Sequence, residues 1–365
     1  MSSAYKSFTK SYFQDMSSLN TSILAVVTTG MNTYVKDDVR LIFVKKILEN
    51  FAGACDAGYK VEVVLVAYDD TSLAVREKIA SMFRSCKRDR AALHYSIQLF
   101  TFRNLPKTAF GTAGDLAIRH RELFLERKKD FDFFLVQEDD VSYDSTAIRY
   151  FADNYLKLRH ISPKIYPNFF DFEDLHGNKY ANYRMRGGYI FKLQTESFFN
   201  SYIGTCGRGY MIPREYLLLI ANDSSWIDPQ NTVGEFNPTV ASTMVLESGV
   251  RLVHPLIEWE NGGIHHMSNR YLGAELGIAQ QGGIDSQDPV FTSPRFDELR
   301  YIFSSCLNRD ASIPPGMKVE GACYACLESA GAVFMSSEIL NPFSSDREIV
   351  VKYECSKFDE KKLRG

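Results

Sequence analysis

The chain has 365 residues, of which 45% are hydrophobic and 24% are charged. This balance supplies enough apolar side chains for a sizeable core, so it predicts one large domain or one domain with an appendage, and it excludes disorder on a large scale. The formal net charge of −3 and the pI near 6.2 provide no basic field, which argues against nucleic acid as a partner.

No stretch of the sequence approaches the roughly 20 consecutive apolar residues of a membrane-spanning helix, so no transmembrane segment is predicted. Residues 1–20 are polar and aromatic and lack the apolar region of a secretory signal. The chain as given is therefore expected to be soluble and cytoplasmic. A lumen of the secretory pathway is the alternative if a targeting segment is missing.

The first half of the sequence alternates strand and helix patterns. The runs 22–29 and 61–68 are apolar, rich in β-branched residues and of strand length, which is typical of central parallel strands. Between them, apolar residues recur at helical spacing behind Asp37 and Asp38, and acidic residues suit the start of a helix. These segments predict one β-α-β unit.

Two more strands and two more helices follow. Helical spacing begins again after Thr71 and Ser72, and the run 93–100 alternates like a strand. A helical stripe over 113–124, with Thr112 as its N-cap, leads into a fourth, apolar strand. Four strands with intervening helices predict an α/β fold with a doubly wound, mainly parallel sheet.

From 142 onward the pattern loosens into aromatic segments punctuated by glycine, which are interpreted as mixed strands and loops. Aromatic surfaces with interspersed polar groups suit sugar rings, because the apolar faces of the rings stack while the hydroxyls form hydrogen bonds. Most of the 26 Phe and 20 Tyr residues are nevertheless expected to fill the core.

The fourth strand ends in three adjacent acids, and this is the most informative feature of the sequence. Adjacent carboxylates repel one another, so this pattern favours either a bound divalent cation or a solvated turn. Ligands of such sheets bind beyond the carboxyl ends of the strands. The polar residues at three strand ends are therefore expected to line one crevice: Thr28, Thr29, Asp69, Asp70, Glu138, Asp139 and Asp140.

This combination resembles the GT-A glycosyltransferases over residues 22–269. Their acidic motif is typically Asp-any-Asp, and the run from Glu138 through Asp139 to Asp140 is a Glu-first version. The resemblance implies that Asp140 binds Mn²⁺ or Mg²⁺ and that Glu138 lies near the ribose or a metal-bound water. It also implies a GT-A (Rossmann-like) sheet, mixed but mainly parallel, with helices on both faces.

The same resemblance assigns donor-binding roles to residues of the other strand ends. It places Thr28, Thr29, Asp69 and Asp70 around the nucleoside, with Asp139 beside them. Arg119, on the helix before the acidic motif, would face the donor phosphates or sugar. An arginine exposed to solvent on the helix surface is the alternative.

The segment around Gly207 and Gly209 is similar to the Gly-Gly-Tyr segment of β-1,3-galactosyltransferase-like members, where glycines let the backbone approach the donor sugar. A tight turn is the alternative. In those relatives a later acid deprotonates the acceptor hydroxyl, and Glu235 is the best match, with Asp228 as a fallback. The usual Glu-Asp pair is absent, which leaves the base and the inverting outcome open.

The adjacent His265 and His266 lie where many GT-A enzymes place a C-terminal metal ligand. Imidazole beside carboxylate and phosphate oxygens suits manganese. Adjacent side chains point differently, so at most one coordinates, and His265 is favoured. Ordinary loop histidines are the alternative.

Four of the seven cysteines lie near the C-terminus: Cys306, Cys323, Cys326 and Cys355. One pair has the spacing of zinc ligands, while the other separations are irregular. A structural tetrathiolate Zn²⁺ site, two disulfides and four reduced thiols all remain open.

Taken with the resemblance, the sequence predicts four regions: an N-terminal extension 1–20, a nucleotide-sugar-binding half 21–145, an acceptor-binding half 146–300 and a Cys-containing C-terminal appendage 301–365. The expected activity is metal-dependent hexosyl or pentosyl transfer from a nucleotide diphosphate sugar to a glycan or other hydroxyl acceptor. The alternatives are a nucleotidyltransferase and a non-catalytic carbohydrate-binding protein. The first is disfavoured because the loop after the first strand has one glycine, Gly30, and no lysine before Lys36.

Overall fold

The computed structural model describes residues 21–29, 37–101, 115–161, 165–175, 177–181, 188–193, 196–201, 209–221, 251–268, 295–297, 299–300 and 303. The chain divides into two compact units, and the boundary falls within one helix, between Ile148 and Arg149. The segment Gly207–Met244 belongs to the first unit. The four predicted regions stay predictions.

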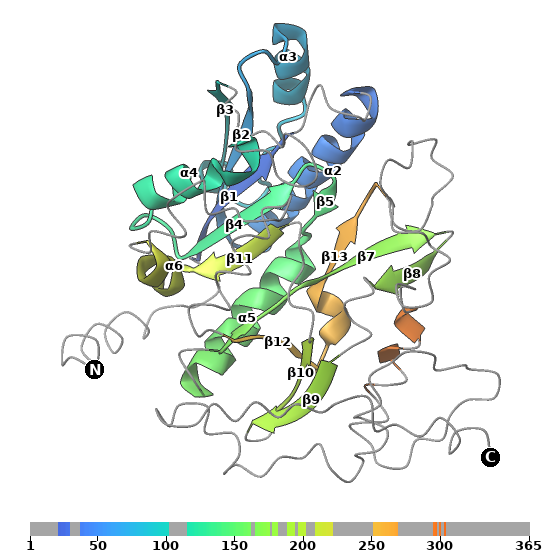
Figure 1. Cartoon of the computed structure of the whole chain (residues 1–365). Helices are drawn as coiled ribbons and strands as arrows, with labels where there is room; N and C mark the ends of the chain where they lie inside the picture. The colour runs from blue at the N-terminus through green and yellow to red at the C-terminus, as the bar shows by residue number, and fades with distance from the viewer. Residues whose placement is uncertain are drawn as a thin grey trace. The chain divides into compact units, whose positions relative to one another are not determined.

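The first unit is built on a five-stranded sheet with the order β11-β4-β1-β2-β3 (Figure 1). Its strands are β1 (Ser22–Thr28), β2 (Lys60–Tyr68), β3 (Leu93–Phe100), β4 (Phe133–Glu138) and β11 (Gly209–Pro213). The first four run parallel, and β11 pairs antiparallel with β4. The predicted mixed, mainly parallel α/β sheet is confirmed.

Helices cover both faces of this sheet. Its helical elements are α2 (Asp37–Asp56), α3 (Leu73–Ser81), the short 3-10 helices η2 (Arg90–Ala92) and η3 (Asp115–Ile118), α4 (His120–Glu126) and α6 (Arg214–Ile220). Figure 1 shows α2 and α4 on opposite sides of the sheet, as right-handed crossovers require when the chain first moves outward from β1 and then returns to β4. With both faces covered, the apolar runs of β1 and β4 are almost completely buried.

The helix starts follow local chemistry where the structure describes them. Ser72 caps α3, because its hydroxyl accepts a hydrogen bond from Val75 N at 3.3 Å. The predicted helix start at Thr71 and Ser72 is therefore confirmed. The stripe over 113–124 corresponds to η3 followed by α4, and its predicted cap, Thr112, lies outside the described residues.

The strand order reverses between β1 and β4. From β1 the chain moves outward through β2 to β3, and it then returns to the other side of β1 to form β4. The register places Thr28 beside Glu138. The first acid of the triplet therefore ends its strand at the topological switch point, where ligands of open α/β sheets bind.

The second unit combines most of a long helix with short strands. Its elements are α5 (Ser145–Ile161), β6 (Ile165–Pro167), β7 (Phe170–Leu175), β8 (Asn178–Ala181), β9 (Gly188–Leu193), β10 (Glu196–Ser201), β12 (Arg251–Pro255), η6 (Trp259–Gly262) and β13 (Gly263–His266). One sheet has the order β6-β12-β10-β9, and β7 pairs parallel with β13 and antiparallel with β8.

The interpretation of the sequence after 142 as strands and loops is wrong for α5. This helix buries a stripe of alanine, isoleucine, leucine and aromatic residues, and its start is capped by Asp144, whose Oδ1 accepts from Ala147 N at 2.8 Å. Aromatic side chains have weak helix propensity and are common in strands, so the local pattern favours a strand. The burial of one face stabilises the helix instead.

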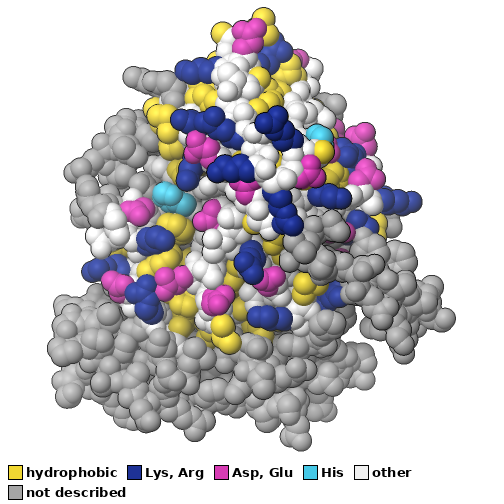
Figure 2. All heavy atoms as spheres, turned by 180° about the vertical axis from the view of Figure 1, so that it is seen from behind, with side chains coloured by type: hydrophobic (Ala, Val, Ile, Leu, Met, Phe, Trp, Pro, Cys, Tyr) yellow, Lys and Arg dark blue, Asp and Glu magenta, His cyan; other side chains and the backbone are white. Residues whose placement is uncertain are grey.

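In the part of the chain that is described, no helix is long and apolar enough to cross a membrane. The face shown in Figure 2 carries Lys and Arg side chains interspersed with Asp and Glu side chains. Such a mixture agrees with the net charge of −3.

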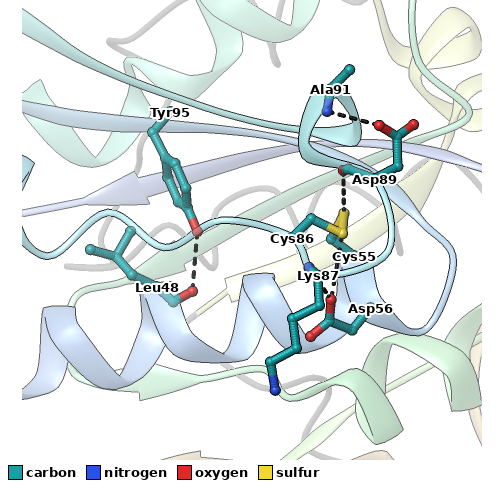
Figure 3. The surroundings of a disulfide bond; sticks show 8 residues. All are labelled: Leu48, Cys55, Asp56, Cys86, Lys87, Asp89, Ala91 and Tyr95. Atoms are coloured by element: carbon teal, nitrogen blue, oxygen red, sulfur yellow. Dashed lines mark hydrogen bonds between the residues drawn. A yellow bond between two sulfur atoms is a disulfide. The ribbon is translucent and has the colours of Figure 1, made fainter.

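A disulfide joins Cys55, in the last turn of α2, to Cys86, which follows α3 (Figure 3). Both residues are buried, and their Cα atoms are 5.7 Å apart. Beside the bond, Asp56 Oδ1 accepts a hydrogen bond from Lys87 N at 2.6 Å. The end of α2 is thereby fastened to the segment that leads into β3. In the sequence these two cysteines look scattered, because no local spacing connects them.

Removal of this disulfide is expected to destabilise the first unit. The cysteines are 31 residues apart, and releasing a loop of that length lowers the free energy of unfolding by about 4 kcal/mol. Urea unfolding of the double variant Cys55→Ala/Cys86→Ala checks this. The difference between wild type and variant should vanish in dithiothreitol; a difference that persists under reduction would show that lost packing, and not the covalent link, causes the effect.

Candidate functional site

Two threonines end β1, and they differ in what their hydroxyls do. Thr29 is buried, and both its backbone N and its Oγ1 donate to Val66 O at 2.9 Å. That hydroxyl therefore fastens the end of β1 to β2. Thr28 Oγ1 is buried without a hydrogen-bond partner among the described residues. Of the two predicted nucleoside contacts, Thr28 is therefore the one whose hydroxyl is not engaged by the described residues.

The acids Asp139 and Asp140 form a turn between β4 and β5 (Val141–Ser142). Gln137 Nε2 donates to Val141 O across this turn at 2.7 Å. Ser142 Oγ accepts from Asn50 Nδ2 of α2 at 2.5 Å. Both hydrogen bonds are buried, so the turn is fixed from the strand side and from the helix side.

The three adjacent acids occupy different environments. Asp139 is 1% exposed and forms an ion pair with Arg40 of α2, whereas Glu138 and Asp140 remain partly exposed. A buried carboxylate is stable only when a cation or hydrogen-bond donors compensate it. Arg40 supplies that compensation for Asp139. The two outer acids are therefore the ones that solvent and ligands can reach.

Among the described residues, no three His, Cys, Asp or Glu side chains gather around one point. An all-protein metal cage is therefore absent from that part of the chain. Mg²⁺ is usually held by one or two carboxylates together with substrate phosphates and water, and Mn²⁺ takes the same oxygen ligands. Coordination of such a cation by Glu138 and Asp140 stays a prediction.

The acids that follow β2 lie at the same edge of the sheet. Asp69 N donates to Phe100 O at 3.1 Å, and Asp69 Oδ2 accepts from Thr101 Oγ1 at 2.9 Å. Asp69 thereby joins the ends of β2 and β3. Asp70 is exposed. Both acids follow the strand end next to that of β1, and their contact with a nucleoside stays a prediction.

Arg119 follows η3, and the alternative of a solvated arginine is wrong for it. Its side chain is 3% exposed, its Nη1 contacts Glu122 Oε1 at 2.6 Å, and its guanidinium lies 5.0 Å from the ring centroid of Phe100. Burial of an arginine requires such partners. Its contact with the donor stays a prediction.

Gly209 opens β11, and packing accounts for its identity. A Cβ built there would lie 2.4 Å from Val136 O and 2.7 Å from Tyr143 Oη. The absence of a side chain lets β11 approach β4 closely. The predicted approach of Gly209 to a donor sugar remains untested, and Gly207 lies outside the described residues.

His265 and His266 end β13 in the second unit. His266 is fully buried, with Nδ1 2.5 Å from Glu173 Oε1 and Nε2 2.6 Å from Ser268 Oγ, so both ring nitrogens are already bonded within the protein. The ring of His265 stacks on Phe172 at 5.0 Å, and its Nε2 has no hydrogen-bond partner in the described part of the chain. Burial lowers the pKa of His265, which keeps the imidazole neutral. Of the predicted pair, His265 has the nitrogen that suits a ligand.

The remaining predicted site residues lie outside the described residues: the candidate bases Glu235 and Asp228, and the cysteines Cys306, Cys323, Cys326 and Cys355. Their roles stay predictions. Arg40 is a site residue that the sequence pattern does not reveal. The sequence gives little indication of Arg40, because an arginine in the first turn of a helix is ordinarily a surface residue.

The sequence matches no protein-family model and no curated protein. Among solved structures, the chain is similar to a protein from Desulfovibrio desulfuricans described as a nucleotide-diphospho-sugar transferase, with a TM-score of 0.31 and 9% identity, over 63% of this chain and 78% of that one. It is also similar to an active-site mutant of LgtC, with a TM-score of 0.30 and 13% identity, over 68% of this chain and 74% of that one. Likeness of this degree establishes neither activity nor substrate, so function is inferred from the geometry of the site.

Substitution of Gly209 by alanine is expected to lower the free energy of unfolding by about 1–3 kcal/mol, because the added methyl group collides with the backbone of β4. Gly53→Ala is the matched control: a Cβ built at Gly53 has Ser145 Oγ as its nearest atom, 4.0 Å away, and alanine favours the helix by about 1 kcal/mol. Urea unfolding measures both. Equal stability of the two variants would contradict the packing explanation for Gly209.

Burial also lowers the pKa of His254, on β12, to about 4. In the unfolded chain the ordinary value of about 6.5 applies, so the unfolded state binds the proton first as the pH falls. Stability contributed by neutral His254 is complete above about pH 6.5 and is lost between pH 6.5 and 4, by roughly 1.4 kcal/mol per pH unit. Unfolding in urea at several pH values should show this slope reduced in His254→Gln; equal slopes in the two proteins would exclude His254 as its source.

Proposed function

We propose that this protein is a divalent-cation-dependent glycosyltransferase that moves a hexosyl or pentosyl group from a nucleotide diphosphate donor to a glycan or another hydroxyl acceptor. One observation carries the proposal. The partly exposed acids Glu138 and Asp140 lie at the carboxyl end of β4, where the strand order of the sheet reverses. The buried Oγ1 of Thr28 adjoins them in register and lacks a partner among the described residues.

These groups suit a nucleotide diphosphate. A bound Mn²⁺ or Mg²⁺ supplies positive charge that neutralises the diphosphate as it leaves. Asp140 would hold this cation directly, and Glu138 would bind a water of its shell or the ribose. Thr28 can donate its hydroxyl proton to an oxygen of the nucleotide. Coordination by His265 is a separate prediction, because this residue belongs to the second unit.

A carboxylate base completes the reaction. Glu235, or Asp228 in its place, would accept the proton of the acceptor hydroxyl while the acceptor oxygen forms its bond to the anomeric carbon. The bond from that carbon to the diphosphate oxygen breaks, and the electron pair departs with the diphosphate. Attack on the face opposite the leaving group inverts the anomeric configuration. With Glu235 as the base, the enzyme is therefore expected to invert the anomeric configuration.

The disulfide between Cys55 and Cys86 is an indication of the cellular compartment in which the protein acts. Disulfides persist in oxidising environments and are rare in the reducing cytosol. The buried Cys55–Cys86 bond therefore favours the secretory-pathway alternative over the cytoplasmic expectation. Location in the secretory pathway is compatible with the proposed transfer of a sugar to a glycan.

Asp140→Asn is expected to reduce Mn²⁺-dependent transfer or donor hydrolysis by at least about a hundredfold, because the loss of one ligand charge weakens the hold on the cation. The measurement is product formation from a panel of nucleotide diphosphate sugars with and without Mn²⁺. Asp153→Asn is the control, since that acid is 46% exposed on α5. Full activity of Asp140→Asn would contradict the assignment.

Two other results would favour the alternative functions. Pyrophosphate release from a sugar phosphate and a nucleoside triphosphate would favour the nucleotidyltransferase. Glycan binding that does not depend on cation or nucleotide would favour the non-catalytic binding protein.

A further inference from the structure

The strand β3 forms one edge of the sheet in the first unit (Figure 1). All eight of its residues, Leu93–Phe100, pair with β2 on one side. Among the described residues, no strand pairs with its other side. The backbone N–H and C=O groups on that side therefore form a row without partners in that part of the chain, which is the template that an additional strand requires.

This edge lacks the features that ordinarily prevent pairing with another chain. Edge strands are protected by charged side chains, proline, bulges or a very short length. The strand β3 contains no Lys, Arg, Asp, Glu or Pro, and its eight residues match those of β2 one for one without a bulge. Only Leu93 is buried, and Leu99 is 38% exposed. The edge is therefore long, regular and partly exposed.

The two ends of β3 lie beside opposite charges. The segment 87–90 before the strand is exposed and carries three cationic side chains and one acid, so its net charge is positive. The exposed Asp69 and Asp70 lie at the other end, where Asp69 N donates to Phe100 O at 3.1 Å. The strand thus begins beside positive charge and ends beside negative charge.

We propose that β3 is the dimerisation edge of this protein: a second copy of the chain pairs with it in antiparallel orientation about a two-fold axis. Such pairing joins the sheets of the two copies into one continuous sheet. It also places the start of β3 in each copy beside the end of β3 in the other. The segment 87–90 then meets Asp69 and Asp70 of the other copy, and symmetry repeats this contact at both ends of the interface.

The charges select both the occupant and its direction. Any strand can form the backbone hydrogen bonds, but a second copy brings charges that complement those beside β3. Parallel pairing of two copies would instead place like charges together, which is unfavourable. An edge pair alone buries little surface, so we expect a dissociation constant on the order of micromolar, and added salt should weaken the dimer.

The interface is independent of the proposed function. Asp69 and Asp70 are also the predicted nucleoside contacts, whereas the segment 87–90 has no part in the proposed transfer. Self-association is therefore measured without nucleotide or divalent cation, so that its outcome does not depend on whether the protein transfers a sugar.

The test is sedimentation velocity of the full chain over a range of concentrations, with the 41.5 kDa monomer as the reference mass. Wild type should dimerise. Arg88→Glu/Arg90→Glu should raise the dissociation constant at least about tenfold, because it makes the charge of the segment 87–90 negative. Asp69→Lys/Asp70→Lys should do the same. An equimolar mixture of the two variants should form a heterodimer of about wild-type affinity, because opposite charges meet again at both ends.

Restored association in the mixture separates an electrostatic contact from structural damage, which mixing does not repair. Arg149→Glu/Lys157→Glu is the matched control, since both side chains are exposed on α5 and the change in net charge is the same. This control should dimerise like wild type. A monomeric wild type overturns the proposal, and so does a dimer that the Arg88 and Arg90 substitutions leave unchanged. A mixture that stays monomeric overturns the antiparallel arrangement.

Two further measurements locate the interface on the strand itself. Leu99→Lys introduces the kind of charge that protects edge strands, and it should also raise the dissociation constant at least about tenfold. The backbone amides of β3 should exchange their hydrogens more slowly as the protein concentration rises, because pairing protects them. Exchange that does not depend on concentration in a protein that dimerises would place the interface elsewhere and overturn the proposal.

Discussion

The pairing of β1 with β4 is the constraint on which the candidate site depends. Both strands are buried on their two faces, and their parallel register sets Ala25 beside Leu135 and Thr28 beside Glu138. A shift by one residue would exchange the two faces of β4. It would also move Glu138 away from Thr28. The position of the acidic turn is therefore set by the pairing of two buried strands and not by the acids themselves.

That burial then assigns different roles to chemically similar residues. Thr28 and Thr29 are adjacent and identical, yet only the hydroxyl of Thr29 is used by the neighbouring strand. Among the three acids, Asp139 pairs with Arg40 while the outer two face solvent in part. In each case one side chain is buried and bonded within the fold, whereas its neighbours are partly exposed. The sequence shows the set of residues but not this division.

The sequence is sufficient to predict the four parallel strands because each has a local pattern: a short apolar run in β1, β2 and β4, and alternation of polar and apolar residues in β3. It is insufficient where structure comes from distant contacts. The strand β11 is recognised only by its pairing with β4, and Cys55 meets Cys86 only after α2 and α3 have packed. Arg40 looks like a surface residue until α2 is placed on the sheet. The aromatic stripe of α5 has no strong helix propensity and depends on its buried face.

In the second unit, two adjacent histidines also differ in the contacts that they make. His265 and His266 are neighbours on one strand, so their side chains point to opposite faces of it. His266 is held by Glu173 and Ser268, which uses both ring nitrogens and secures the end of β13. His265 instead stacks on Phe172, and its Nε2 has no hydrogen-bond partner among the described residues. Preorganisation of this kind lowers the entropy lost on binding a ligand, since the ring is already oriented. His265 is therefore the better candidate ligand, because His266 already forms the hydrogen bonds that hold the end of β13.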